Sequence, residues 1–301
     1  AIRVLLDRIA AHRQGRAMPG LDPDLIAAMR QTLNDADRDP AFAAEALYLP
    51  GEATLADEMA VVDVEAIHAA RETARHELGL ALADAFGDTY RRLADPGPYK
   101  TDGRAIGRRA LRNVSLSYIA ARGGREGARL ATVQFEAQQN MTDVLAALSV
   151  LVDTDCPERA AALARFYERW QDEPLVVDKW FAMQARSVLP GTVAAVRELT
   201  RHPAFSRSNP NRMRAVVGTF SQGNQLHFHA ADGAGYEFLA EEVLALDRAN
   251  PTTSARLVQP LGQWRRFDPV RQALMKAQLD RILKTPALSP NTYEMVSKSL
   301  A

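Results

Sequence analysis

Residues Ile2–Gln14 read IRVLLDRIAAHRQ, and this stretch carries the pattern that decides the fold. Its apolar residues Ile2, Leu5, Leu6 and Ile9 are spaced i, i+3, i+4 and i+7, which places them on one face of an α-helix. The same helical spacing recurs over the ranges 64–93, 105–121, 144–152, 159–170, 175–187, 236–246 and 270–283. The sequence therefore predicts helices with one apolar face along most of its length.

Six dipeptides mark expected helix starts, because each places a side-chain oxygen directly before a proline. Such an oxygen caps the free amides of a first helical turn, and proline fits the first helical position. The dipeptides are Asp22-Pro23, Asp39-Pro40, Asn209-Pro210, Asn250-Pro251, Asp268-Pro269 and Ser289-Pro290. Gly123-Gly124 and Pro190-Gly191 mark the expected ends of the helices over 105–121 and 175–187.

Evidence for β-strands is nearly absent, and the best candidate is the isolated segment Gln225–His229. About a dozen helices joined by short loops are too many for one four-helix bundle. Stacked helix pairs bury many one-sided helices efficiently. No fixed repeat length is visible in the sequence. The predicted fold is therefore all-α, an irregular superhelix of stacked helix pairs that resembles an α-solenoid.

The charge of the chain argues against a nucleic-acid partner, because its 301 residues carry 37 basic and 37 acidic side chains. The distribution is uneven. Between Glu198 and Asp232 there is no acidic residue, whereas Arg207, Arg212 and Arg214 lie in this acid-free stretch. Arg207 to Arg214 spans the expected helix start at Asn209, whose free amides add positive potential. The stretch is either an anion-binding surface or a patch that packs against other helices.

Cysteine content and hydropathy indicate where the chain works. Cys156 is the only cysteine, which excludes a disulfide framework and favours a reducing compartment. The longest apolar run, Val144–Val152, is about half as long as a membrane span requires. The first residues do not have the pattern of a signal peptide. We therefore expect a cytoplasmic protein with no membrane partner.

Two groups of residues have some metal-binding character. His76-Glu77 begins the zincin motif H-E-x-x-H, but Leu80 occupies the second histidine position, so this stretch cannot hold a catalytic zinc ion. His227, His229 and Asp232 form a second cluster, in which an H-x-H pair would bind zinc if a further ligand approached. An independent metalloenzyme built on these three residues is one alternative, and histidines that bond backbone groups are the other.

Several longer motifs resemble those of a known family. The runs Ser208–Arg212 with Arg214, and Phe228–Tyr236, resemble the C-terminal region of the bacterial aminopeptidase N family of zinc metallopeptidases. Further stretches agree with this family in the same order along the chain, namely 109–113, 140–143 with 145–148, 178–181 and 256–261. A collinear set of this kind is more specific than any single motif.

This resemblance implies a part of an enzyme and not a whole one. Residues 1–301 are expected to form a single all-helical C-terminal domain, with the catalytic and N-terminal domains absent from this sequence. The domain would cover the catalytic domain of the same polypeptide and form a chamber that admits short peptides. The family's zinc ligands and its G-x-M-E-N signature lie upstream, so this chain is expected to hold no metal, to contain no catalytic residue and to hydrolyse nothing by itself.

The resemblance also suggests three substrate-channel residues. Arg214 and Arg256 match positions that face the chamber, and Thr252 matches a position near the pocket for the N-terminal residue of the substrate, where the family usually has glutamine. A guanidinium at Arg214 would bind the carboxylate end of a short peptide. The alternative from another class is a free-standing α-solenoid scaffold that binds a protein partner without catalysis.

Overall fold

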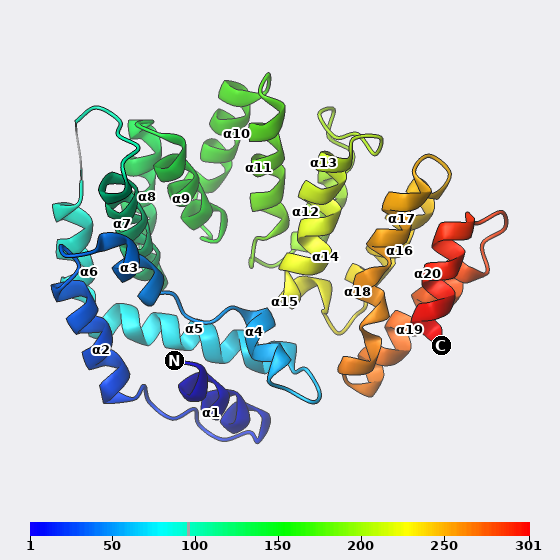
Figure 1. Cartoon of the computed structure of the whole chain (residues 1–301), viewed down its shortest axis with the longest axis horizontal. Helices are drawn as coiled ribbons and strands as arrows, with labels where there is room; N and C mark the ends of the chain where they lie inside the picture. Colours follow the sequence, from blue (N-terminus) through cyan, green and yellow to red (C-terminus); the bar gives the residue numbers. More distant parts are fainter. Residues whose placement is uncertain (95–96) are drawn as a thin grey trace. The chain divides into compact units, whose positions relative to one another are not determined.

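The computed structural model describes residues 1–94 and 97–301, and this part of the chain is 71% helical with no β-strand. Figure 1 shows helices following one another along the described chain, with no strand between them. The predicted all-α class and the stacking of helix pairs are therefore confirmed. Among the described residues, none of the helices combines the length and the hydropathy of a membrane span. The chain divides into two compact units.

Unit 1 comprises residues 1–55 and 65–164. Its core contains the stacked rings of Phe86 and Tyr118, whose centroids lie 4.5 Å apart. The main packing pairs are α3 with α7, α6 with α7, and α8 with α9. Its helices are α1 (Ile2–Arg13), α2 (Pro23–Asn34), α3 (Pro40–Ala46), α4 (Glu52–Asp57), α5 (Val64–Ala81), α6 (Ala83–Arg92), α7 (Gly103–Ala121), α8 (Glu126–Ala137), α9 (Met141–Val152) and the first half of α10 (Glu158–Trp170).

Unit 2 comprises residues 56–64 and 165–301. Helix α16 packs against α17 and α19, and α17 packs against α20. A π-helical segment, η1, packs against α11. The elements are α11 (Pro174–Ala185), α12 (Thr192–Leu199), α13 (Pro210–Met213), η1 (Arg214–Gly218), α14 (Thr219–Gly223), α15 (Gln225–Phe228), α16 (Ala234–Asp247), α17 (Pro251–Leu257), α18 (Gln259–Gly262), the 3₁₀ turn η2 (Trp264–Arg266), α19 (Pro269–Leu283) and α20 (Pro290–Leu300).

All six predicted helix starts are confirmed. In each case the proline occupies the beginning of a helix, and the side chain before it accepts a hydrogen bond from an amide of the first turn. For example, Asp22 Oδ1 accepts from the Asp24 amide at 2.8 Å, and Asn250 Oδ1 accepts from the Thr253 amide at 3.0 Å. The expected stop at Gly123-Gly124 also follows α7, and both glycines have positive φ.

Three local predictions were wrong. The apolar face over 64–93 belongs to two helices, because the backbone leaves the α region at Leu82, with φ −116° and ψ 23°. The best candidate for a strand, Gln225–His229, contains α15 instead, a single helical turn capped by Asn224, whose Oδ1 accepts from the His227 amide. The helix over 175–187 ends at Ala185, and Gly191, with φ 82°, precedes α12 instead. Short apolar patterns do not distinguish these possibilities.

Candidate functional site

Arg214 is the first residue of η1, the π-helical segment of unit 2. Its side chain is exposed, while the four residues that follow it in η1 are buried, namely Ala215, Val216, Val217 and Gly218. Within the described part of the chain, its guanidinium bonds one side chain, that of Asn211, whose Oδ1 accepts from Nη1 at 3.2 Å. Single π-helical turns occur frequently at functional sites. The guanidinium of Arg214 is therefore available to a ligand at the surface of unit 2.

Thr252 and Arg256 lie on α17, which begins at the cap formed by Asn250 and Pro251. They are four residues apart, so their exposed side chains share one face of the helix. The opposite face is buried, and there Ser254 Oγ donates to the Val243 carbonyl at 2.9 Å. Helix α17 packs on α16 and α20, whereas η1 packs on α11 and α14. The three predicted channel residues thus lie on two separate packing layers of unit 2.

The acid-free stretch is neutralised by acids from other parts of the sequence. Arg207 makes a bidentate ion pair with Glu242, with Nε 2.8 Å from Oε2 and Nη2 2.7 Å from Oε1. The hydrogen bond to Glu242 raises the pKa of Arg207 above its usual range. Arg212 pairs with Asp178, and Arg201 pairs with Glu198. Most of this stretch is therefore a packing patch, and among its four arginines Arg214 is the one that forms no ion pair with another described residue.

The histidine cluster does not form a metal centre. His227 Nε2 lies 2.9 Å from the carbonyl of Val188, and His229 Nδ1 lies 2.9 Å from the hydroxyl of Tyr236. Burial, and secondarily Arg271, lowers the pKa of His229 to about 3. Asp232 accepts a hydrogen bond from the Ala234 amide and so shapes a turn. Across the described ranges, no group of three His, Cys, Asp or Glu side chains is placed to hold a metal ion.

The residues of the incomplete zincin motif have structural roles. Glu77 binds the buried guanidinium of Arg8, with its Oε1 2.7 Å from Nη2. His76 Nδ1 lies 3.0 Å from the carbonyl of Ala121 at the end of α7. These contacts join α5 to α1 and to α7.

Cys156 is not favoured as a nucleophile. Burial raises the pKa of its thiol, which lowers the fraction of reactive thiolate.

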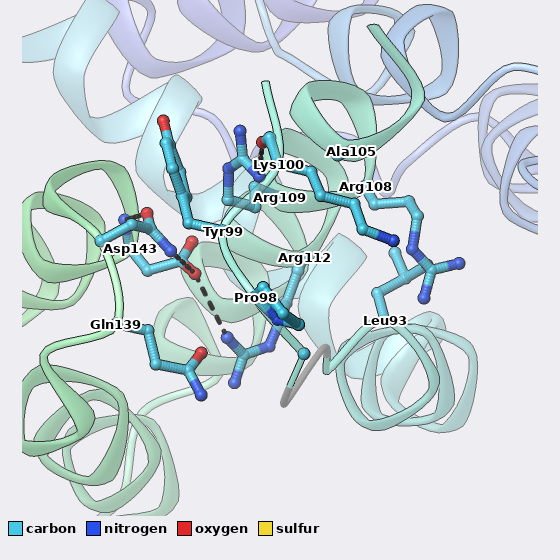
Figure 2. A pocket seen from close by; sticks show the side chains of 12 residues that line it. Leu93, Pro98, Tyr99, Lys100, Ala105, Arg108, Arg109, Arg112, Gln139 and Asp143 are labelled. Atoms are coloured by element: carbon cyan, nitrogen blue, oxygen red, sulfur yellow. Dashed lines mark hydrogen bonds and ion pairs between the residues drawn. The ribbon is translucent and has the colours of Figure 1, made fainter. Parts of the chain in front are cut away.

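A pocket in unit 1 was not found by reasoning from the sequence. It lies between the segment 97–100, helix α7 and the start of α9 (Figure 2). Its walls bring together two of the recognisable sequence motifs, 109–113 and 140–143, which are about 30 residues apart. A visible signal was the density of basic residues at the start of α7, where Arg104, Arg108, Arg109 and Arg112 occur within nine positions. The sequence did not indicate that the segment 97–100 and the start of α9 would lie beside that helix.

Comparison with known proteins identifies the family. A family model described as "Domain of unknown function (DUF3458_C) ARM repeats" matches residues 1–301. The chain belongs to this DUF3458_C family. Its ARM-repeat description agrees with the helix pairs seen in each unit.

Curated relatives of this DUF3458_C chain are bacterial aminopeptidases. It is 42% identical over 273 residues to aminopeptidase N of Caulobacter vibrioides, a match that covers 91% of this chain and 32% of the relative. It is 37% identical over 293 residues to aminopeptidase N of Escherichia coli K12, covering 97% of this chain and 33% of the relative. The expected resemblance to the C-terminal region of aminopeptidase N is confirmed.

A solved structure agrees with these relatives. The crystal structure of Legionella pneumophila aminopeptidase A in complex with aspartic acid matches with a TM-score of 0.89 and 29% identity. The match covers 99% of this chain and 36% of that one. The chain thus spans about a third of the length of the aminopeptidases it resembles. The similarity is that of a helical C-terminal domain of an aminopeptidase.

Proposed function

We propose that residues 1–301 act as the C-terminal domain of a cytoplasmic zinc aminopeptidase that removes N-terminal residues from peptides. The observation that carries this proposal is the similarity to aminopeptidases along more than nine tenths of the chain. In this proposal the domain packs on the catalytic domain of the same polypeptide and helps to enclose a chamber for short peptides. A free-standing scaffold is not favoured, because the relatives are peptidases about three times as long.

Zinc belongs to the other part of the proposed enzyme. The described residues of this chain do not provide a set of zinc ligands, since both candidate histidine groups are bonded to other protein atoms. No catalytic step is therefore assigned to these residues. Their contribution is to bind and orient the peptide and to limit its size.

Arg214 and Arg256 are the proposed contacts for the peptide's carboxylate. Both side chains are exposed, and neither forms an ion pair with another described residue. An arginine of this kind offers two parallel N–H donors to a carboxylate without first breaking a salt bridge. Thr252, one helical turn before Arg256, is proposed to lie near the N-terminal end of the substrate. Its short hydroxyl reaches less far than a glutamine amide would.

The test uses the polypeptide in which this chain follows the zinc-binding domain. Arg214→Ala and Arg256→Ala should each raise KM for a dipeptide or tripeptide by about tenfold, because a charge-assisted hydrogen bond is lost. KM for an uncharged aminoacyl anilide should change little, and kcat should be preserved, since the contact is made equally in ground and transition states. Arg281→Ala, which removes an exposed arginine of α19, is the matched control.

Equal effects on the peptide and on the anilide would contradict the assignment of these arginines. Failure of the polypeptide to cleave peptides at all, with zinc bound, would contradict the proposed function itself. The two results are distinguishable because the first is measured in an active enzyme.

A further inference from the structure

The pocket of unit 1 carries an excess of positive charge. Among its described lining residues, four side chains are cationic, Lys100, Arg108, Arg109 and Arg112, and one is a carboxylate, Asp143, so their net charge is +3. Figure 2 shows Lys100 and Arg108 extending toward the same side of the view, with Asp143 on the other side. A concave site lined by one sign of charge concentrates ligands of the opposite sign.

The carboxylate of Asp143 is already committed to protein groups. Its Oδ1 accepts from Asn113 Nδ2 at 2.9 Å, and its Oδ2 accepts from Asn140 Nδ2 at 2.9 Å. Arg112 Nη1 lies 3.7 Å from Oδ2. Asp143 is only 5% exposed, and within the described residues it forms no ion pair with any other cation of the pocket. It compensates Arg112, whereas Lys100, Arg108 and Arg109 form no ion pair with a carboxylate of the described residues.

Two of the arginines are held in fixed positions. The guanidinium of Arg109 lies 4.7 Å from the ring centroid of Tyr99 and donates to the Lys100 carbonyl at 2.9 Å. The guanidinium of Arg112 lies 4.6 Å from the ring centroid of Tyr90. The Nε atoms of both arginines are buried donors with no acceptor in the described part of the chain. Positioning before a ligand arrives lowers the entropy cost of binding it.

Lys100 and Arg108 differ from these two arginines. Neither side chain has a hydrogen-bond or ion-pair partner among residues 1–94 and 97–301, and Lys100 is exposed. The pocket therefore combines two fixed guanidinium groups with two cations that are unengaged by the protein. Structural arginines in this chain, such as Arg207 and Arg212, have acidic partners instead.

We propose that this pocket binds the phosphate group of a small molecule. Three cations without an ion pair match a phosphate, which carries two negative charges on one group, better than a dicarboxylate, whose two charges lie on separate groups. Planar guanidinium groups with a lysine are also a common set of phosphate ligands. The cavity volume of about 40 Å³ suits one such group and not a large ligand. This inference does not depend on the proposed peptidase function, since it concerns unit 1 alone.

The experiment is calorimetric titration of the 301-residue chain at pH 8 and constant ionic strength, with three probes. These are inorganic phosphate, AMP and succinate. We expect inorganic phosphate to bind with a Kd of about 1 mM or tighter, and succinate to bind at least tenfold more weakly. Tighter binding of AMP than of phosphate would identify a nucleotide as the source of the group, and equal or weaker binding would identify free phosphate. Both results support the proposal.

The variants test the site and not the fold. The double variant Lys100→Gln with Arg108→Gln removes the two unengaged cations and should weaken phosphate binding by about tenfold or more. Arg104→Gln is the matched control, because Arg104 is an exposed arginine on the same helix outside the pocket. Thermal unfolding of all variants should be unchanged. The proposal is overturned if phosphate gives no binding at 10 mM, if Arg104→Gln weakens it as much as the double variant, or if succinate binds as tightly as phosphate.

Discussion

At the scale of single residues, Arg8 is the most deeply buried charge of unit 1. Its side chain is 0% exposed. Nη1 and Nη2 donate to the two carboxylate oxygens of Glu77 at 3.0 and 2.7 Å, and Nη1 also donates to the Pro19 carbonyl at 2.6 Å. A charge in such a place is stable only while its partners are present. The ion pair therefore holds α1 against α5, although Arg8 and Glu77 are 69 residues apart in the sequence.

We expect Glu77→Ala to lower the free energy of unfolding by about 3 kcal/mol, since it leaves a buried guanidinium without its carboxylate. Urea denaturation followed by circular dichroism measures this loss. Asp7→Ala is the control, because Asp7 is an exposed acid of the same helix as Arg8, and its loss should cost less than about 0.5 kcal/mol. If the two variants were equally stable, the ion pair would contribute nothing to holding α1.

His229 is expected to make the stability of the folded chain depend on pH. It is 4% exposed, stacks on Phe267 and lies beside Arg271, whose own carboxylate partner is Asp268. Burial first, and then Arg271, lowers the pKa of this imidazole to about 3. The unfolded chain therefore binds a proton at His229 below about pH 6.5 while the folded chain does not, so stability falls as the pH drops from 6.5 toward 3.

The difference between pH 7 and pH 5 should be about 2 kcal/mol in the free energy of unfolding. Urea denaturation of the wild-type chain and of His229→Gln at both pH values isolates this contribution, because other titrating groups affect both proteins alike. His229→Gln should lose about 2 kcal/mol less than the wild type on going to pH 5. Parallel losses in the two proteins would show that His229 is not kept neutral.

At the scale of helices, the contact between α3 and α7 depends on a glycine. A Cβ atom built on Gly107 would lie 2.6 Å from the backbone nitrogen of Ala41. Backbone cannot move aside as a side-chain end can, so the two helices would have to separate. Gly103, on the same helix, has no heavy atom within 4 Å of such a Cβ.

Gly107→Ala should therefore destabilise unit 1 by about 2 kcal/mol or more, as overpacking does. Gly103→Ala should be neutral or slightly stabilising, because alanine favours a helix over glycine. Chemical denaturation of both variants provides the comparison. A neutral result for Gly107→Ala would mean that α3 does not pack as closely on α7 as described.

Helix starts were predictable from sequence because their causes are local. Asp268 and Ser289, for instance, accept from amides two or three residues away, and proline follows each of them directly. Helix ends were less predictable. The break at Leu82 has no proline or glycine at that position, and the apolar face continues across it, so the sequence pattern of one long helix and of two successive helices is the same.

At the scale of the whole molecule, charge could not be predicted by counting along the sequence. The acid-free stretch 199–231 looks strongly basic, yet Glu242 and Asp178 come from outside it to neutralise Arg207 and Arg212. The charge of the pocket in unit 1 could not be predicted from the sequence either. Arg112 and Asp143 are 31 residues apart, and only the packing of α7 against α9 brings them together. Contacts of this range are decided by tertiary structure.

Unit 2 also depends on a distant piece of sequence, residues 56–64. The Val62 amide donates to the Arg266 carbonyl at 2.8 Å, and the Arg266 guanidinium binds Asp57 Oδ1 at 3.0 Å and the Ala56 carbonyl at 2.8 Å. The Val62 and Val64 side chains are buried. This strap, defined as residues 56–64, should therefore open and close together with residues 165–301, as regions that share contacts do.

Hydrogen exchange followed by mass spectrometry tests that expectation in the intact chain. The Val62 amide should be protected about as well as amides of α19, since its acceptor belongs to the same unit. Arg266→Ala removes the bonds to Asp57 and Ala56 and should raise exchange within the strap about tenfold, while amides in the middle of α5 keep their protection. Arg281→Ala removes an exposed arginine from α19 without touching the strap, and should leave its exchange unchanged. Fast exchange at Val62 in the wild-type chain would show that the strap moves independently of unit 2.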